Sequence, residues 1–293
     1  MTGDQVTGRH EVRWLFHSTA MVADYDRAVA LLGDLVGLRV LEYGESEEPG
    51  IGRRGGMAWA GDNAIEIGQP IVDGGAAQFV SRFGGGMHSV AVQVRDVDAT
   101  IAHLEANGVR IAARPRPEMC FSDPRDTGGV FLQWSCFELD VDPRFGAPRP
   151  PAPPKAIAPA TRHAYVGALV DEPSRLAVRL ATLVGTDVTF DDTDAPPGEP
   201  AAGVSLGDCT LALFSLVPGD SERVWGRHYE RARTHLLALE TNHIDEVEAA
   251  LRNAGTNVVR ADADTRLIVL DPAATGGVQV ALTDRLLPGD PRS

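Results

Sequence analysis

Four polar residues in the first half of the chain have the types and the placement of metal ligands. His17 and His88 stand in two short apolar stretches that favour β-strands, and Glu66 and Gln133 stand in two more. A carboxylate on a half-buried sheet face is costly unless it is ion-paired, hydrogen-bonded or metal-bound. Two imidazoles, a carboxylate and an amide oxygen suit one divalent ion such as Zn, Co, Ni, Mn or Fe, with positions left for water. The set predicts a metal site, with pairing of Glu66 to an arginine as the alternative.

The elements that must position these residues recur along the chain. A strand, a helix and a glycine that ends the helix follow one another, and 20 positions separate the start of the pattern from its glycine. A fourth copy ends at Gly185, and its first position falls on Tyr165, with His163 two residues before it on the same strand face. The other three copies run from His17 to Gly37, from His88 to Gly108 and from His235 to Gly255.

A second repeat shows which copies kept their polar residues. The stretch Asp123–Trp134 returns as Asp271–Leu282, and Asp, Pro, Thr, Gly, Gly and Val recur in place. Ala281 then stands where the first copy has Gln133, and the same comparison puts Ala212 in the place of Glu66. Two of the four ligand types are absent from the second half, so we expect one metal, held within the first half.

A run of prolines divides the chain. Seven prolines lie between Pro143 and Pro159, a composition that favours an extended linker over a core. We therefore expect a module over residues 1–145, a linker over 146–155 and a second module over 156–293. Each module should be α+β, with two strand-helix-three-strand units, eight strands and two helices. The tail after Leu287 is expected to be frayed.

Composition excludes several classes of partner. The formal net charge of −14 argues against nucleic acid and against anionic membranes, since either would need a basic face. The N-terminus is polar without a signal-peptide core, and the three cysteines show no metal-type spacing, so we expect a cytoplasmic protein. A phosphorylated substrate would need a local cluster of arginines, because Lys155 is the only lysine. The Arg53-Arg54 pair is interpreted as a solvated face.

The repeated units, with a histidine on each first strand and an acidic or amide residue on each last strand, resemble the vicinal oxygen chelate superfamily. That superfamily includes glyoxalase I, methylmalonyl-CoA epimerase, extradiol dioxygenases and fosfomycin- and bleomycin-resistance proteins. The Asp-Pro-Arg-Asp-Thr-Gly-Gly-Val stretch is most similar to the epimerase branch, and Gln133 departs from the glutamate found there. The segment 47–51 resembles that branch's acidic segment, which implies Glu48 as the catalytic base. Thr19, Phe131 and Ser135 are expected to contact the substrate.

The resemblance implies a metal-dependent lyase or isomerase, similar to epimerases or glyoxalases, that polarises the carbonyl or enolate of a small oxygenated substrate. One alternative is a non-catalytic small-molecule-binding or antibiotic-resistance protein. An extradiol-type dioxygenase is the other, although those enzymes resemble this chain with their site in the C-terminal half. The expected partner is a small molecule, and whether the chain forms a homodimer is left open.

Overall fold

A computed structural model describes residues 10–47, 52–148, 155–217 and 219–292 of the chain. The first half forms one mixed eight-stranded sheet with the strand order β2-β3-β4-β1-β5-β8-β7-β6. Its strands are β1 (Val12–Met21), β2 (Val40–Ser46), β3 (Arg53–Ala60), β4 (Asn63–Pro70), β5 (Gly86–Val94), β6 (Ile111–Arg116), β7 (Met119–Ser122) and β8 (Leu132–Ser135). Its helices are α1 (Tyr25–Val36), α2 (Gly75–Phe83) and α3 (Val97–Ala106), with the short 3-10 helix η1 (Pro143–Phe145) after the last strand.

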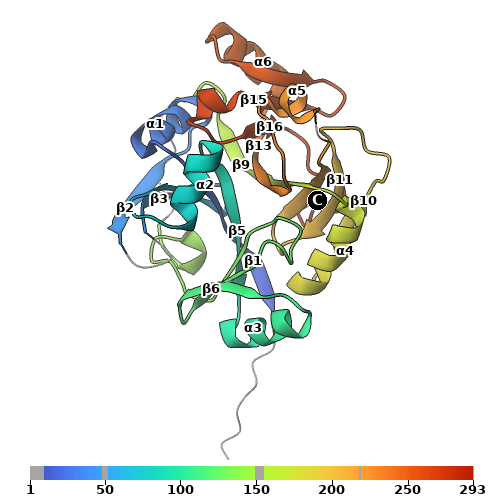
Figure 1. Ribbon diagram of the computed structural model, residues 1–293. Helices are drawn as coiled ribbons and strands as arrows, with labels where there is room; N and C mark the ends of the chain where they lie inside the picture. The colour runs from blue at the N-terminus through green and yellow to red at the C-terminus, as the bar shows by residue number, and fades with distance from the viewer. Residues whose placement is uncertain (1–9, 48–51, 149–154, 218, 293) are drawn as a thin grey trace, which may run out of the picture.

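The second half repeats this sheet with the order β10-β11-β12-β9-β13-β16-β15-β14. Figure 1 draws the first half in blue to green and the second half in yellow to red. Its strands are β9 (Ala160–Val170), β10 (Val188–Asp191), β11 (Pro200–Ser205), β12 (Thr210–Ser215), β13 (Arg233–Thr241), β14 (Val258–Asp262), β15 (Leu267–Leu270) and β16 (Val280–Thr283). Its helices are α4 (Pro173–Val184), α5 (Ser221–Trp225), α6 (Ile244–Asn253) and the 3-10 helix η2 (Pro272–Thr275). The predicted α+β fold of four strand-helix-three-strand units in two modules is confirmed.

Each module has one helix more than the sequence predicted. α2 and α5 lie between the two units of their modules, outside the repeating pattern. The repeating helices are as expected: the Asp24 side chain accepts a hydrogen bond from the Arg27 amide at 3.0 Å, and Gly37 ends α1 in the left-handed region with φ 75°. Gly185 ends α4 with the same φ of 75°.

The two modules share their hydrophobic cores. One cluster joins Leu32 of α1 and Ile65 of β4 to Leu237 of β13 and Leu251 of α6. A second cluster joins strand β5 and helix α3 to strand β9 and helix α4 in the same way. Because each cluster contains residues of both halves, the modules pack as one body. No helix in the described ranges is long and apolar enough to span a membrane.

The segment after each last strand returns to the first strand of its own module. Arg144 donates from Nη1 to the Leu15 carbonyl and from Nη2 to the Phe16 carbonyl, both at 2.7 Å. Arg292 donates in the same way to the carbonyls of His163 and Ala164. The expectation that the tail after Leu287 is frayed is therefore wrong for its described part, because Arg292 hydrogen-bonds to strand β9.

Candidate active-site cavity of the N-terminal module

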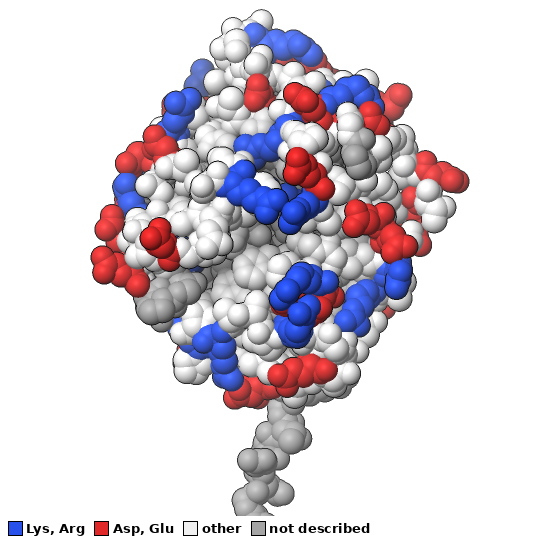
Figure 2. Space-filling model, viewed as in Figure 1, with Lys and Arg blue, Asp and Glu red and all other residues white. Residues whose placement is uncertain are grey.

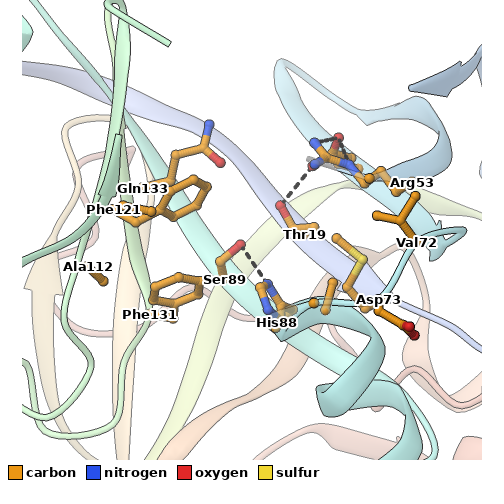
Figure 3. Close-up of a pocket in the computed structure, with 17 residues that line it drawn as sticks. Thr19, Arg53, Val72, Asp73, His88, Ser89, Ala112, Phe121, Phe131 and Gln133 are labelled. Atoms are coloured by element: carbon orange, nitrogen blue, oxygen red, sulfur yellow. Dashed lines mark hydrogen bonds and ion pairs between the residues drawn. The ribbon is translucent and has the colours of Figure 1, made fainter. Parts of the chain in front are cut away.

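A cavity of about 370 Å³ opens on the sheet of the N-terminal module. Figure 3 shows Gln133, Phe121 and Phe131 on one side of it, Thr19, Arg53 and Val72 on the other, and His88 with Ser89 between them. Its walls are mostly apolar and its polar groups converge from strands β1, β3, β4, β5 and β8, which is the usual make-up of a small-molecule site. The polar lining residues are Thr19, Arg53, Glu66, Asp73, His88, Ser89 and Gln133.

Glu66 is buried, with 3% of its surface exposed, and its carboxylate is fully engaged. Arg53 forms an ion pair with Oε1 and donates a hydrogen bond from Nε to the same oxygen at 3.0 Å. The Tyr43 hydroxyl also donates to Oε1, and Thr19 donates to Oε2 at 3.1 Å. Burial by itself raises the pKa of Glu66, but Arg53, His17 and these hydrogen bonds outweigh it and hold the pKa at about 2.

Arg53 and Tyr43 are site residues that the sequence analysis missed. Residue alternation on β3 puts Arg53 on the same face as Met57, which lies opposite Glu66 in the sheet register. That alternation was the available signal, and it contradicts the interpretation of Arg53 as part of a solvated face. Gly55 makes the arrangement feasible, because a β-carbon there would lie 2.3 Å from the Tyr43 hydroxyl oxygen.

His17 lies beside this carboxylate group, on strand β1. Its Nδ1 is 3.1 Å from the Thr19 hydroxyl and 3.9 Å from Glu66 Oε2, and its Nε2 is 3.5 Å from Gln133 Nε2. Burial lowers the pKa of His17 to about 4, so the imidazole is neutral at physiological pH. The structure therefore brings His17, Glu66 and Gln133 together, as expected from their placement in the sequence.

His88 does not occupy the ligand position predicted for it. Thr19 lies opposite Glu66 across one strand pair, and Ala91 lies opposite Gln133 across the equivalent pair. Two residues before Thr19 is His17, whereas two residues before Ala91 is Ser89. Ser89 is therefore the counterpart of His17. The count of 20 positions missed this because helix α3 is shorter than α1, so that 19 positions separate Ser89 from Gly108 and counting back 20 reaches His88, the extra residue that precedes Ser89 in strand β5.

The extra residue is His88, and the bulge gives it surroundings of its own. Its Nδ1 lies 3.3 Å from the Ser89 hydroxyl, and its ring lies edge-on between Phe79 and Phe131 at centroid distances of 4.9 and 5.2 Å. Burial lowers the pKa of His88 to about 4, and the guanidinium groups of Arg53 and Arg233 act in the same direction. His88 thus presents a neutral imidazole to the cavity.

The donor set does not fit a divalent metal ion as predicted. The carboxylate of Glu66 accepts its hydrogen bonds from a guanidinium and two hydroxyls, and a serine stands where a second imidazole was expected. Within the described ranges, no three His, Cys, Asp or Glu side chains form a group that could hold a metal. The contacts of Glu66 match the alternative interpretation, in which it pairs with an arginine. Metal binding stays a prediction.

The remaining predicted residues divide between the cavity wall and the layer behind it. Thr19 and Phe131 line the cavity, which supports their assignment as substrate contacts. Ser135 is fully buried and accepts a hydrogen bond from Gln133 Nε2 at 2.9 Å, so it orients the amide and does not line the cavity. Glu48 lies outside the described residues.

The C-terminal module has filled the equivalent space with side chains. Its register pairs Gly167 with Ala212 and Ala238 with Ala281, which makes Tyr165 the counterpart of His17. Leu236 then corresponds to Ser89. Buried aromatic residues occupy the concave face around these positions, and the cavity beside Trp225 measures about 10 Å³. These contacts support the expectation of a degenerate second site.

Residues 16–121 match the family model described as the Glyoxalase/Bleomycin resistance protein/Dioxygenase superfamily. The matched range begins in strand β1 and ends in strand β7, and so covers most of the first module. The N-terminal module is therefore similar to this superfamily over the matched range, and the C-terminal module repeats the fold of the first.

Individual proteins also resemble the chain. Mitochondrial methylmalonyl-CoA epimerase from Homo sapiens is 28% identical over 140 residues, which cover 44% of this chain and 78% of the epimerase. A triple mutant of 4-hydroxymandelate synthase from Streptomyces coelicolor aligns over 95% of both chains with 14% identity and a TM-score of 0.64, which shows a shared two-module fold. Methylmalonyl-CoA epimerase from Mycobacterium tuberculosis aligns with 48% of this chain and 95% of its own, at 24% identity and a TM-score of 0.39.

Proposed function

We propose that the N-terminal module is an isomerase or lyase that forms the enolate of a small oxygenated substrate. The cavity carries this proposal: apolar walls enclose a half-buried cation, Arg53, together with a neutral imidazole, His88. An enolate needs both, because a group must accept the proton removed next to the carbonyl and positive charge must stabilise the oxygen. The human relative is an epimerase, which supports the same reaction class.

The steps can be assigned to residues of this chain. A substrate carbonyl oxygen placed near Arg53 receives the negative charge when the neighbouring carbon loses its proton. The pair of electrons of the broken C–H bond moves to the carbon–carbon bond, and the carbonyl pair moves to the oxygen. His88 is one candidate acceptor of the proton, and Glu48 is the other. Return of the proton to the opposite face completes an isomerisation, whereas loss of a group from the next carbon completes an elimination.

A guanidinium also limits this chemistry. Arg53 is already paired with Glu66, so an enolate must share the cation with a carboxylate. This internal neutralisation favours the second candidate function, a binding module that holds its ligand without chemistry. A dioxygenase with its site in the C-terminal half is disfavoured, because Tyr165, Ala212, Leu236 and Ala281 fill that module's equivalent positions.

Hydrogen exchange with solvent separates these functions even before a product has been identified. The protein is incubated in D₂O with a panel of 2-oxo acids, thioesters and aldehydes, and each compound is followed by NMR for loss of the proton next to its carbonyl. Enolate formation predicts catalysed exchange for at least one compound that binds, and loss of that exchange in Arg53→Gln. Ligand binding without exchange for every compound bound would establish the binding module instead.

A further inference from the structure

A second cavity, of about 350 Å³, lies between the end of helix α2 and the segment that joins α5 to β13. Four of the residues that line it are arginines, contributed by both modules: Arg82, Arg227, Arg231 and Arg233. Figure 2 shows basic side chains gathered near the middle of the molecule, above a hollow lined mostly by uncharged atoms. The cavity has no counterpart among the residues that the sequence analysis singled out.

Arg233 is the buried member of this group, with 9% of its surface exposed. Its guanidinium donates to the carbonyls of Thr234 at 3.2 Å and Met87 at 3.3 Å, and it lies over the rings of Phe79 and Phe83 at 4.6 and 4.4 Å. Burial lowers the pKa of Arg233 to about 10, which leaves the side chain charged at neutral pH. No carboxylate of the described residues forms an ion pair with it.

Arg227 brings a second positive charge into the same space. Its Nη1 donates to the Gly85 carbonyl at 3.0 Å. A β-carbon on Gly86 would lie 3.0 Å from Arg227 Nη1 and 3.4 Å from Arg233 Nη2, so both cations reach one short stretch of backbone that lacks a side chain. Two like charges at this separation repel, and the charge of Arg227 adds to the lowering of the pKa of Arg233.

The acidic residue that lines the cavity does not relieve this repulsion. The Glu230 carboxylate lies 3.6 Å from His228 Nε2, and no ion pair joins it to an arginine in the part of the chain that the structure describes. Elsewhere the arginines are commonly paired, as Arg54 is with Asp26 and Glu42. The chain has a net charge of −14, so carboxylates are available to pair with arginines. A group of arginines that has no carboxylate partner among the described residues, and that includes a buried member, is therefore a specific feature of this pocket.

We propose that this arginine pocket binds a phosphoryl group. Guanidinium groups match phosphate oxygens through paired N–H donors, and a dianion would cancel the repulsion between Arg227 and Arg233. The chain has one lysine, so a phosphate site must be made of arginines. This site does not depend on the function proposed for the N-terminal cavity.

The source of the phosphoryl group is either a separate phosphate-bearing metabolite or the far end of a substrate held in the N-terminal cavity. The second source is considered because Phe79 packs against one lining residue of each cavity: its ring lies 4.9 Å from that of His88 and 4.6 Å from Arg233 Cζ. In such a substrate, the phosphoryl group at the arginines and the carbonyl group near His88 would be apart by about the width of one aromatic side chain.

Titration calorimetry with inorganic phosphate at fixed ionic strength tests the site. Saturable binding should be weakened roughly tenfold or more in Arg231→Gln and in Arg82→Gln, which are exposed positions where substitution leaves the fold intact. The matched control is Arg223→Gln, because Arg223 is exposed on the neighbouring helix and paired with Asp220. Absence of saturable binding in the wild type, or wild-type affinity in both pocket variants, would overturn the proposal.

A second titration distinguishes the two sources. Erythrose 4-phosphate joins a carbonyl to a phosphoryl group through a short carbon chain, and it is compared with inorganic phosphate in the wild type and in His88→Ala. Tighter binding of the sugar phosphate that is lost in His88→Ala identifies a substrate phosphate. Equal binding of both compounds, unchanged in His88→Ala, identifies a separate phosphate ligand at the same arginines. Binding of either compound that persists unchanged in the Arg231→Gln protein contradicts the site.

Discussion

The charge of the N-terminal cavity is decided by one residue pair. Arg53 neutralises Glu66, the buried carboxylate at the cavity, and Tyr43 and Thr19 complete its hydrogen bonds. Removing one partner of such a pair leaves a buried charge without compensation, which is more costly than never having built the pair. The pair therefore fixes its own geometry, and a ligand meets a cation whose position is already set.

At the residue scale, the first prediction concerns Ser89. If Ser89 holds the position of a lost imidazole ligand, Ser89→His should raise the affinity for Zn or Co roughly tenfold or more, since a nitrogen donor is added beside His17 and Gln133. His88→Ala should leave metal affinity unchanged. Competition with a chromogenic chelator measures both. Loss of metal in His88→Ala, together with no gain in metal affinity in Ser89→His, would instead support the ligand set predicted from the sequence.

The second prediction separates the two candidate bases. Glu48→Gln and His88→Gln each remove one proton acceptor and keep the size of the side chain. In the variant that lacks the true base, deuterium exchange should be slower than in the wild type by about a hundredfold or more. The other variant should exchange at nearly the wild-type rate, and its binding affinity serves as the control for an intact cavity. Exchange that survives in both variants would exclude both residues.

Residue types were enough to predict three members of the site and not the fourth. His17, Glu66 and Gln133 were identified because polar residues in apolar strands stand out. His88 was assigned to a ligand position because a fixed count along the chain assumes helices of equal length, and α3 is shorter than α1, whereas the hydrogen-bond register identifies Ser89 directly. Arg53 was missed because the two adjacent arginines were interpreted together, whereas the alternation along β3 places Arg53 on the inward face with Met57.

At the scale of elements, a turn of one module holds the first strand of the other. Asp208, in the turn between β11 and β12, accepts a hydrogen bond from the Leu15 amide at 2.8 Å and from Asn63 Nδ2 at 2.9 Å. Gly207 permits this approach, because a β-carbon there would lie 2.5 Å from the Arg13 carbonyl oxygen. The strand that carries His17 is therefore fixed from the C-terminal module.

Asp208→Ala should destabilise the chain by about 1–3 kcal/mol, because the Leu15 amide and the Asn63 side chain both lose their acceptor. Urea unfolding measures the change, and Asp187→Ala, an exposed aspartate of the same module, is the matched control. If Asp208→Ala lowers the free energy of unfolding by no more than the control does, the hydrogen bonds of Asp208 do not stabilise the strand.

Most elements followed from periodic patterns, and the exceptions have physical reasons. α2 starts at a glycine without a side-chain cap, so no cap signal marks its beginning, although Ala76, Phe79, Val80 and Phe83 recur at helical spacing. α5 spans five residues, too few for a helical period to be seen. The repeated units were recognised because the same glycines end the same helices.

At the scale of the whole molecule, the two modules share one fold but differ in whether the fold encloses a cavity. The first copy keeps a cavity of about 370 Å³, and the second fills its own with aromatic side chains. His235 lies in that filling, with Trp225 at 4.5 Å and Phe214 at 5.3 Å, and both of its ring nitrogens lack hydrogen-bond partners in the described part of the chain. The second module thus contributes packing and three of the four arginines of the arginine pocket.

Buried neutral histidines should make the whole chain sensitive to acid. Burial lowers the pKa of His17 and His88 to about 4 and of His163 to about 3, and it holds that of His235 well below its ordinary value. The unfolded chain takes up these protons near pH 6.5, so it binds more protons than the folded chain below that pH. Stability is therefore complete above about pH 6.5 and falls toward pH 4, by up to about 1.4 kcal/mol per pH unit for each histidine.

Urea unfolding between pH 4.5 and 7.5 measures that slope. His235→Phe removes one of the buried imidazoles and should make the slope shallower by one histidine's contribution, whereas His228→Gln, at an exposed position, should keep the wild-type slope. An identical slope in His235→Phe would show that this imidazole stays neutral in both states or leaves its site before unfolding.

The return of Arg144 to strand β1 also bears on how the protein is made. Its bonds to Leu15 and Phe16 join residues 129 and 128 positions apart, and the bonds of Arg292 to His163 and Ala164 span the same two separations. Contacts of such long sequence separation close late in folding. On a translating ribosome, the first module can therefore assemble most of its sheet while strand β1 still lacks the hydrogen bonds from Arg144. Only after the chain has been made beyond the proline-rich stretch can Arg144 reach these carbonyls and fix the strand that carries His17.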